Sequence, residues 1–324
     1  MNVEDKNMNV LIADKFSKLA QDELIKLGFR VTYKPEVILN TLADAIRQHS
    51  TDILIVRSTR VTELALSVDS LKLVIRAGSG FNNIDINTAK DKSVFVCNCP
   101  GKNANAVTEL AFGLIIALDR YIPQNVSDLK IGLWNKAEYS NGYGLYGRTL
   151  GLIGLGTIGA SMIPRAKAFG MKVVGWSRGL SPERAIDLGI QMKSDPMEVA
   201  SSSDIVSLHV ALNQDTRSLV DSKFLFAMRY GSYLINTSRA EVIDETALAD
   251  AVKNRGLKIG IDVFNNEPAL GNGKIHNSLF ELDGVIGTHH IGGQTVEAQL
   301  SIANETVRII TEYRLKGVPP NLVY

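Results

Sequence analysis

TLGLIGLGTIGASMIPRAKAFG, residues 149–170, places a glycine-rich turn between an apolar run and a helix-like run. The apolar run 149–154 predicts a buried strand, and residues 160–170 predict a helix. The turn between them has the pattern GxGxxG. In this context the first glycine permits a tight turn, the second lets a pyrophosphate approach the backbone, and the third lets helix and strand pack closely. The stretch predicts a dinucleotide-binding unit whose phosphate contacts are Gly154, Gly156, Thr157, Ile158 and Gly159.

Short apolar runs alternate with amphipathic runs on both sides of this turn, which is typical of parallel sheets covered on both faces. Strands are predicted at 9–13, 30–33, 51–57, 71–78, 93–98, 149–154, 172–176, 205–210, 233–237, 257–264 and 284–289. A helical pattern over 104–120 separates two series, and a last helix over about 296–316 is expected to cross back to the first. The predicted fold class is α/β, with two Rossmann-like or flavodoxin-like parallel-sheet domains joined by long helices and a cleft between them. The predicted domains are 1–103 with 297–324, which binds substrate, and 104–296, which binds the dinucleotide.

Composition excludes several classes of protein. The 324 residues are 45% hydrophobic and carry 35 Lys and Arg against 34 Asp and Glu, a net charge of +1, so neither nucleic acid nor an anionic membrane is an expected partner. Acidic residues precede the first apolar run, which argues against a signal peptide. The longest apolar stretch, 110–118, is about half of the roughly 20 residues that a membrane span needs. We therefore expect a soluble, cytoplasmic protein with reduced cysteines, and no spacing of His, Cys or carboxylates predicts a metal site.

The strand after the glycine turn ends in Gly175-Trp176-Ser177-Arg178, where an acid that binds the adenine-side ribose is expected. A carboxylate there would repel a 2′-phosphate, whereas Ser177 and Arg178 are able to bind one. The alternative is that Arg178 is solvated or stacks on adenine and the site takes NAD. The sequence leaves NAD and NADP open.

Reactive side chains follow three successive predicted strands, at the strand ends where ligands of open α/β sheets bind. They are Arg239, Glu267 and the adjacent histidines His289 and His290. Each alone is the kind of residue that is usually solvated, but together they suit hydride transfer on a 2-hydroxy acid. A guanidinium binds the carboxylate and polarises the C2 oxygen. An imidazole takes or returns the hydroxyl proton, and a carboxylate on its far nitrogen fixes the tautomer and favours imidazolium.

Seven segments spread over nearly the whole chain resemble the D-isomer-specific 2-hydroxyacid dehydrogenases, and most closely the short D-3-phosphoglycerate dehydrogenases. The segments are VRSTRVT (56–62), IRAGSGFNNID (75–85), NCPGKNANAVTELAFGLIIALDR (98–120), GRTLGLIGLGTIG (147–159), NTSRAEVIDETAL (236–248), DVFNNEP (262–268) and THHIGGQT (288–295). This resemblance implies that Arg239, Glu267 and His290 are the catalytic residues, with His290 rather than His289 as the acid/base.

The resemblance also implies further contacts. The loop Gly78-Ser79-Gly80 would present backbone N–H groups to the substrate carboxylate, and Arg57, Thr59 and Arg76 would lie near a substrate phosphate; strand-end salt bridges are the other interpretation of the two arginines. Cofactor contacts are implied for His209, Thr216, Thr237 and Asp262. For His209, a structural role is an open alternative.

These observations predict an oxidoreductase that interconverts 3-phospho-D-glycerate and 3-phosphooxypyruvate with NAD or NADP, the first step of serine synthesis. A glyoxylate/hydroxypyruvate reductase or another D-2-hydroxyacid dehydrogenase is the alternative, and a non-catalytic dinucleotide-sensing corepressor is a remote one. The resemblance implies a homodimer that uses the segment around Trp134 between subunits. Because the chain ends at Tyr324, we expect no appended serine-binding domain and no inhibition by serine through one.

Overall fold

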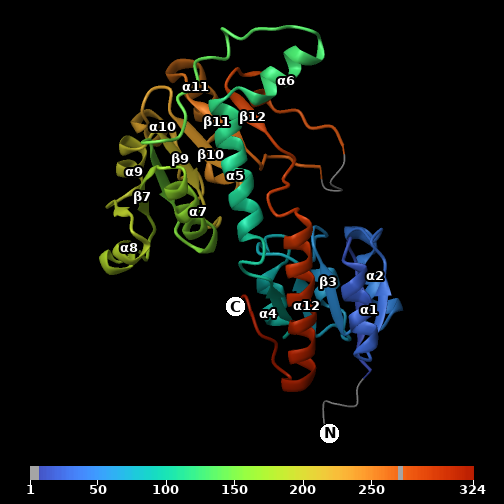
Figure 1. Cartoon of the computed structure of the whole chain (residues 1–324). Helices are drawn as coiled ribbons and strands as arrows, with labels where there is room; N and C mark the ends of the chain where they lie inside the picture. The colour runs from blue at the N-terminus through green and yellow to red at the C-terminus, as the bar shows by residue number, and fades with distance from the viewer. Residues whose placement is uncertain (1–6, 269–272) are drawn as a thin grey trace. The chain divides into compact units, whose positions relative to one another are not determined.

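The computed structural model of this chain describes residues 7–268 and 273–324. The chain divides into two compact units, Met1–Asn103 with Gln294–Tyr324, and Ala104–Gly293 (Figure 1). The second division lies three residues before the predicted 296/297 boundary. The prediction that the chain begins without a signal peptide rests partly on residues 1–6, and these residues lie outside the described part of the chain. Within the described ranges, every helix falls short of the length and apolarity that a bilayer crossing demands.

The first unit contains a five-stranded parallel sheet in the order β2-β1-β3-β4-β5. The strands are β1 (Asn9–Ile12), β2 (Arg30–Tyr33), β3 (Ile53–Val56), β4 (Leu73–Arg76) and β5 (Phe95–Asn98). This is the flavodoxin-like order, whose switch point lies between β1 and β3. Strand β3 is buried at every position, because helices cover both faces of the sheet.

Alternate side chains of these strands enter two separate cores. One face packs against α1 and α12 and the other against α2, α3 and α4. The helices are α1 (Lys18–Lys26), α2 (Leu39–Gln48), α3 (Glu63–Leu66), α4 (Ile86–Asp91) and α12 (Val296–Lys316). Helix α12, drawn in red in Figure 1, buries Ile302, Ile309 and Ile310 on the sheet, as expected of a C-terminal helix that crosses back.

The second unit contains a seven-stranded parallel sheet in the order β12-β11-β10-β9-β6-β7-β8. The strands are β6 (Thr149–Ile153), β7 (Lys172–Trp176), β8 (Gln191–Met192), β9 (Ile205–Leu208), β10 (Tyr233–Asn236), β11 (Lys258–Ile261) and β12 (Val285–Gly287). The order reverses between β6 and β9, as in dinucleotide-binding folds. The predicted α/β class with two parallel-sheet domains is therefore confirmed.

Helices cover both faces of this second sheet as well. Helices α5 and α7 pack on one face, and α9, α10 and α11 on the other. The helices of this unit are α5 (Ala104–Asp119), α6 (Ile122–Lys130), α7 (Thr157–Ala168), α8 (Pro182–Leu188), α9 (Pro196–Ser202), α10 (Ser222–Ala227) and α11 (Glu245–Arg255), with 3₁₀ turns η2 (Ala240–Val242) and η3 (Ser278–Glu281).

Strand β8 and helix α6 are among the elements of the second unit for which no range was predicted. Strand β8 has only two residues, both exposed, so it lacks an apolar signal. Helix α6 follows Tyr121, whose φ of 52° ends α5, and Pro123 is tolerated because it lies in the first turn. Helix α6 buries none of its own residues, so its apolar side chains stay exposed and its pattern differs from that of a core helix.

Candidate functional site

The three glycines of the predicted dinucleotide loop each meet a different steric demand. Gly154 has a φ of +92°, and a Cβ there would lie 2.5 Å from the His209 carbonyl oxygen. A Cβ on Gly159 would lie 2.0 Å from the Gly154 oxygen, so the helix packs too closely for any side chain. A Cβ on Gly156 would meet nothing within 4 Å, which leaves open space over the loop. A tight turn, open space over the second glycine and close helix packing at the third are the features that a pyrophosphate-binding loop requires.

Helix α7 begins within this motif, at Thr157, and no side chain of the described residues caps its first turn. Its first N–H groups and the positive end of its dipole therefore suit an anion. The open space at Gly156 and the uncapped N–H groups of Thr157, Ile158 and Gly159 fit a dinucleotide diphosphate.

Ser177 and Arg178 follow β7, where the acid was expected. The Arg178 guanidinium donates to Asp215, with 2.7 Å between Nη1 and Oδ2, and both side chains are exposed. Asp215 lies in the loop after β9 and was missed by the sequence analysis. The Asp215 carboxylate is therefore paired with the guanidinium that would bind the 2′-phosphate of NADP.

His209 follows β9 at the switch point beside Gly154. Its Nε2 lies 2.9 Å from the Ser207 hydroxyl, and burial lowers the pKa of His209 to about 4. The imidazole is therefore neutral at pH 7. Thr216 uses its hydroxyl within its own turn, where Oγ1 donates to the Ala211 oxygen at 2.6 Å.

Arg239 is held by a turn that Asn236 organises at the end of β10. The buried Asn236 amide donates to the Arg239 oxygen at 2.8 Å and accepts from the Ser238 N–H at 2.9 Å. The Arg239 guanidinium donates to the Ser238 oxygen at 2.6 Å, and among the described residues no carboxylate forms an ion pair with it. Burial lowers the pKa of Arg239, so this side chain is a partly desolvated cation suited to a ligand carboxylate. The neighbouring Thr237 hydroxyl is buried and lacks a hydrogen-bond partner within the described part of the chain.

Glu267 and His290 form a hydrogen-bonded pair. The distance between His290 Nδ1 and Glu267 Oε2 is 2.7 Å, and the other oxygen accepts from the Phe264 N–H at 2.9 Å. Partial burial opposes ionisation of Glu267, but the hydrogen bonds from His290 and Phe264 and the charge of Arg239 outweigh it and lower its pKa. An ionised carboxylate only accepts, so His290 Nδ1 carries the proton and Nε2 is available for proton transfer. Arg239 is close enough to influence Glu267, so the structure brings all three predicted catalytic residues together.

Asp262 anchors the loop that carries His290. One carboxylate oxygen accepts from the Thr288 hydroxyl at 2.6 Å and the Ile291 N–H at 2.8 Å, and the other accepts from the Gly292 N–H at 2.8 Å. His290 lies between these bonds with a φ of 52°, a left-handed conformation uncommon for residues other than glycine. The family resemblance implied a cofactor contact for Asp262, and the sequence did not predict this anchoring contact.

The predicted substrate-binding residues lie in the first unit. The backbone N–H groups of Arg57, Ser58 and Thr59 all donate to Asp14, and the Arg57 guanidinium donates to the Gln294 side chain. Asp14 lies two residues after the end of β1 and was also not predicted. An aspartate within two residues of the end of a buried strand is the signal that Asp14 and Asp262 share.

The loop after β4 places Arg76 against Gly78. Gly78 has a φ of +148°, a conformation that favours glycine, and a Cβ there would lie 1.7 Å from Arg76 Nη1, so the guanidinium would have to move. The Gly78 N–H donates to the Arg76 oxygen at 2.8 Å, and the Ser79 hydroxyl donates to Asn103 at 2.8 Å. Of the predicted loop amides, those of Ser79 and Gly80 have no acceptor among the described residues.

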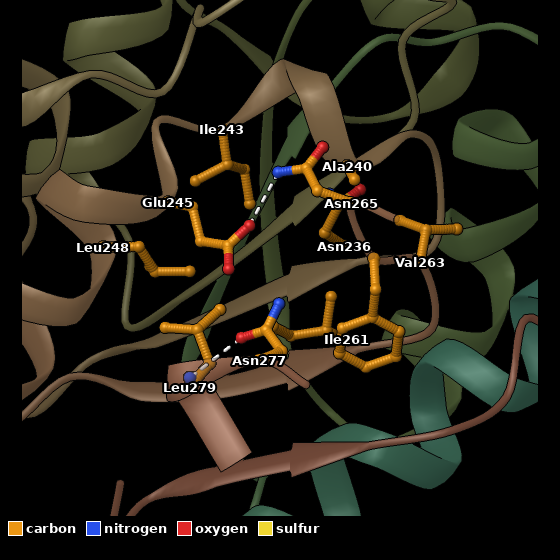
Figure 2. Close-up of a pocket in the computed structure, with 11 residues that line it drawn as sticks. Asn236, Ala240, Ile243, Glu245, Leu248, Ile261, Val263, Asn265, Asn277 and Leu279 are labelled. Atoms are coloured by element: carbon orange, nitrogen blue, oxygen red, sulfur yellow. Dashed lines mark hydrogen bonds between the residues drawn. The ribbon is translucent and has the colours of Figure 1, made fainter. Parts of the chain in front are cut away.

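A small hollow lies among the loops after β10 and β11 (Figure 2). Its walls come from residues 236–248, 261–265 and 277–279, and Asn265 donates to Glu245 there at 2.6 Å. Arg239, Glu267 and His290 do not line it, and its walls are largely apolar, so we assign it to loop packing rather than to chemistry. Within the described residues, His, Cys, Asp and Glu do not gather in any group of three that would hold a metal ion.

The sheet order and the glycine loop define an α/β protein with a dinucleotide-binding fold, in which the hydrogen-bonded Glu267–His290 pair lies in loops that follow the strands. Residues 112–292 match the sequence model of "D-isomer specific 2-hydroxyacid dehydrogenase, NAD binding domain". The chain belongs to the D-isomer specific 2-hydroxyacid dehydrogenase family, and its second unit contains the family's NAD-binding domain.

Two relatives differ in their named substrates. The chain is 38% identical over 314 residues to D-3-phosphoglycerate dehydrogenase of Bacillus subtilis, a match that covers 96% of this chain and 57% of the relative. It is 40% identical over 262 residues to hydroxypyruvate reductase of Thermotoga maritima, covering 80% of this chain and 83% of the relative. The chain thus spans about half the length of the D-3-phosphoglycerate dehydrogenases it matches.

A solved structure shares the complete fold. It is described as an acyclic imino acid reductase in complex with NADPH and D-Arg, is 30% identical, and aligns with a TM-score of 0.84 over 98% of this chain and all of that chain.

Proposed function

We propose that this protein is an NAD(P)-dependent D-2-hydroxyacid dehydrogenase, and that His290 is its acid/base. The observation that carries the proposal is the 2.7 Å hydrogen bond between His290 Nδ1 and Glu267, which orients the imidazole and leaves Nε2 available. Arg239 supports it as a partly buried cation without a carboxylate partner among the described residues. Family membership supports the same reaction class.

The residues divide the chemistry as follows. The Arg239 guanidinium binds the substrate carboxylate and polarises the C2 oxygen. In oxidation His290 Nε2 takes the C2 hydroxyl proton, and in reduction it returns that proton to the oxygen. The ionised Glu267 stabilises the imidazolium. A bound nicotinamide dinucleotide supplies or accepts the hydride, and the loop from Gly154 to Gly159 with the first turn of α7 would hold its diphosphate.

For the substrate, we propose 3-phospho-D-glycerate, oxidised to 3-phosphooxypyruvate in the first step of serine synthesis. Arg57, Arg76 and Thr59 in the first unit support this assignment, since a doubly charged phosphate needs guanidinium partners. Burial lowers the pKa of Arg57, so its charge is partly desolvated as well. The amides of Ser79 and Gly80 are available to the substrate carboxylate.

Hydroxypyruvate or glyoxylate reduction is the second candidate. It is favoured by the 40% identity to a hydroxypyruvate reductase, which this chain matches over 83% of that protein's length. Here Arg57 and Arg76 would serve the fold of the first unit rather than a phosphate.

We propose NAD as the preferred cofactor, because Asp215 neutralises Arg178 and would repel a 2′-phosphate. Thr237, with its buried and unpartnered hydroxyl, is the candidate contact nearest the catalytic segment. The exposed pair rearranges at little cost, so NADP affinity is a direct test of the assignment.

A substrate-by-cofactor panel tests these proposals together. The purified protein is assayed with 3-phosphooxypyruvate, hydroxypyruvate and glyoxylate, each with NADH and NADPH. We expect the highest kcat/KM for 3-phosphooxypyruvate with NADH, and we expect Arg57→Ala and Arg76→Ala to lower that value while leaving glyoxylate reduction intact. An equal or higher kcat/KM for the unphosphorylated acids would select the second candidate, and dinucleotide binding without turnover would refute both.

We also propose a homodimer. Helix α6 and the segment after it expose apolar side chains, including Trp134, which is 80% exposed, and Ile131, which is 73% exposed. Exposed apolar groups of this size typically mark an interaction surface. Sedimentation analysis of the wild-type chain and of Trp134→Ser measures the oligomeric state, and a monomeric wild-type protein would contradict the proposal.

A further inference from the structure

Asp14 makes an unusual set of hydrogen bonds at the switch point of the first sheet. Its Oδ2 accepts from the backbone N–H groups of three consecutive residues, Arg57 at 2.6 Å, Ser58 at 3.0 Å and Thr59 at 3.0 Å. Asp14 follows β1 and the three donors follow the neighbouring strand β3, so a single oxygen joins the carboxyl ends of the two strands. Charge-assisted bonds of this kind are stronger than neutral ones.

Three donors that converge on one oxygen leave the loop little conformational freedom. The Thr59 hydroxyl also donates to the Ala13 oxygen at 3.3 Å, and Asn83 donates to the Thr59 oxygen at 2.8 Å. The backbone of 57–59 is thereby turned towards Asp14 on one side and held by Asn83 on the other. Because Asp14 fixes the backbone conformation of residues 57–59, it also fixes the direction in which the Cα–Cβ bond of Arg57 leaves the backbone.

Asp14 is also the negative charge that acts on the Arg57 guanidinium. Burial lowers the pKa of Arg57, and the nearby Asp14 carboxylate opposes that effect. The guanidinium itself donates to the Gln294 side chain rather than to Asp14. Asp14 therefore bonds the backbone of this loop, while the charged end of Arg57 rests against an uncharged amide that a ligand anion is able to displace.

We propose that Asp14 is a positioning residue for phosphate recognition, which holds residues 57–59 so that the Arg57 guanidinium is presented to the phosphate of the substrate. This inference rests on the proposed function, in which Arg57 binds that phosphate. Asp14 does not touch the phosphate and acts only through the backbone of Arg57, Ser58 and Thr59. Its role is in substrate selectivity rather than in the proton transfer at His290.

The test compares the kcat/KM for 3-phosphooxypyruvate with that for glyoxylate in wild type, Asp14→Ala, Asp14→Asn, Arg57→Ala and the double variant Asp14→Ala/Arg57→Ala. We expect Asp14→Ala to raise the KM for 3-phosphooxypyruvate about tenfold, as for loss of one well-placed charged contact, with glyoxylate kinetics and NADH affinity unchanged. Asp14→Asn keeps an acceptor oxygen and should restore most of the preference. In the Arg57→Ala background, loss of Asp14 should cause no further change in the ratio.

A matched control is Asp52→Ala. Asp52 lies before β3 and accepts from the Asn9 N–H at 2.8 Å, so it joins β1 to the chain before β3 at the opposite edge of the sheet. We expect it to lower the melting temperature without changing the substrate ratio. An unchanged ratio in Asp14→Ala, or an additive loss in the double variant, would overturn the inference while leaving the proposed function intact. An unchanged ratio in Arg57→Ala would overturn both.

Discussion

Two aspartates, one in each unit, use the same chemistry in different ways. Asp14 in the first unit places three consecutive N–H groups on one oxygen. Asp262 in the second unit divides its two oxygens among one hydroxyl and two N–H groups on either side of His290. Asp14 therefore binds the backbone of Arg57 itself, whereas Asp262 binds residues on either side of His290.

The difference matches the precision that the role proposed for each residue requires. A proton transfer demands a fixed imidazole, and His290 is fixed by Asp262 through its loop and by Glu267 through its ring. Binding an anion tolerates more movement, and Arg57 is held at its backbone while its guanidinium rests on the exchangeable Gln294 contact. The comparison therefore predicts large losses of kcat for changes in the second unit and selective losses of KM for changes in the first.

Replacement of His290 tests the comparison with the largest expected effect. His290→Ala should lower kcat by about 10³-fold, within the range for loss of a general acid/base. Dinucleotide affinity, measured by calorimetry, should persist because the glycine loop is untouched. Wild-type turnover in this variant would remove the catalytic assignment and, with it, the contrast between the units.

Removal of the anchor in the second unit should have the next largest effect. Asp262→Ala frees the Thr288, Ile291 and Gly292 donors and lets His290 move, which should lower kcat about 10²-fold, as for a displacement near 1 Å. The measurement is kcat together with NADH affinity. A large loss of NADH affinity at an unchanged kcat would instead favour the role in cofactor binding that the sequence predicted.

Glu267→Gln sharpens the distinction between orientation and charge. The pKa of Glu267 is lowered, so the carboxylate is ionised throughout the neutral range and stabilises the imidazolium. Glutamine still accepts from Nδ1 but carries no charge, so it stabilises the imidazolium less than the carboxylate does. We expect kcat at neutral pH to fall about tenfold. The difference between wild type and variant should disappear only at acid pH, where the wild-type Glu267 becomes protonated below its lowered pKa. A wild-type kcat in the variant would show that Glu267 acts by orientation alone.

Local constraints explain what was predictable from the sequence. Gly154, Gly156 and Gly159 all lie in one strand–turn–helix segment, so their spacing in the sequence predicts the structure of that segment. The buried strands were predicted because parallel strands covered on both faces are continuous apolar runs. Arg239, Glu267 and His290 were proposed from the sequence because each follows a strand whose carboxyl end lies at the edge where ligands of such sheets bind.

Contacts between distant segments explain what was missed. Asp14 and Arg57 are 43 residues apart, and Asp262 and Gly292 are 30 residues apart. The local sequences around these aspartates, DKF (14–16) and DVF (262–264), do not distinguish an aspartate that binds a loop from one that is solvated. Likewise, Ser177 and Arg178 were visible after β7, but the pairing of Arg178 with Asp215 depends on the neighbouring loop after β9.

The sequence by itself determined the two parallel sheets and the glycine-rich loop, because short-range steric and apolar patterns encode them. It also indicated the proposed catalytic residues, by their positions after predicted strands and by resemblance to a family. The tertiary structure alone decided which carboxylate holds which loop. Hydrogen bonds form between whatever groups the sheet order brings within about 3 Å, and that order is a property of the folded chain rather than of any one segment.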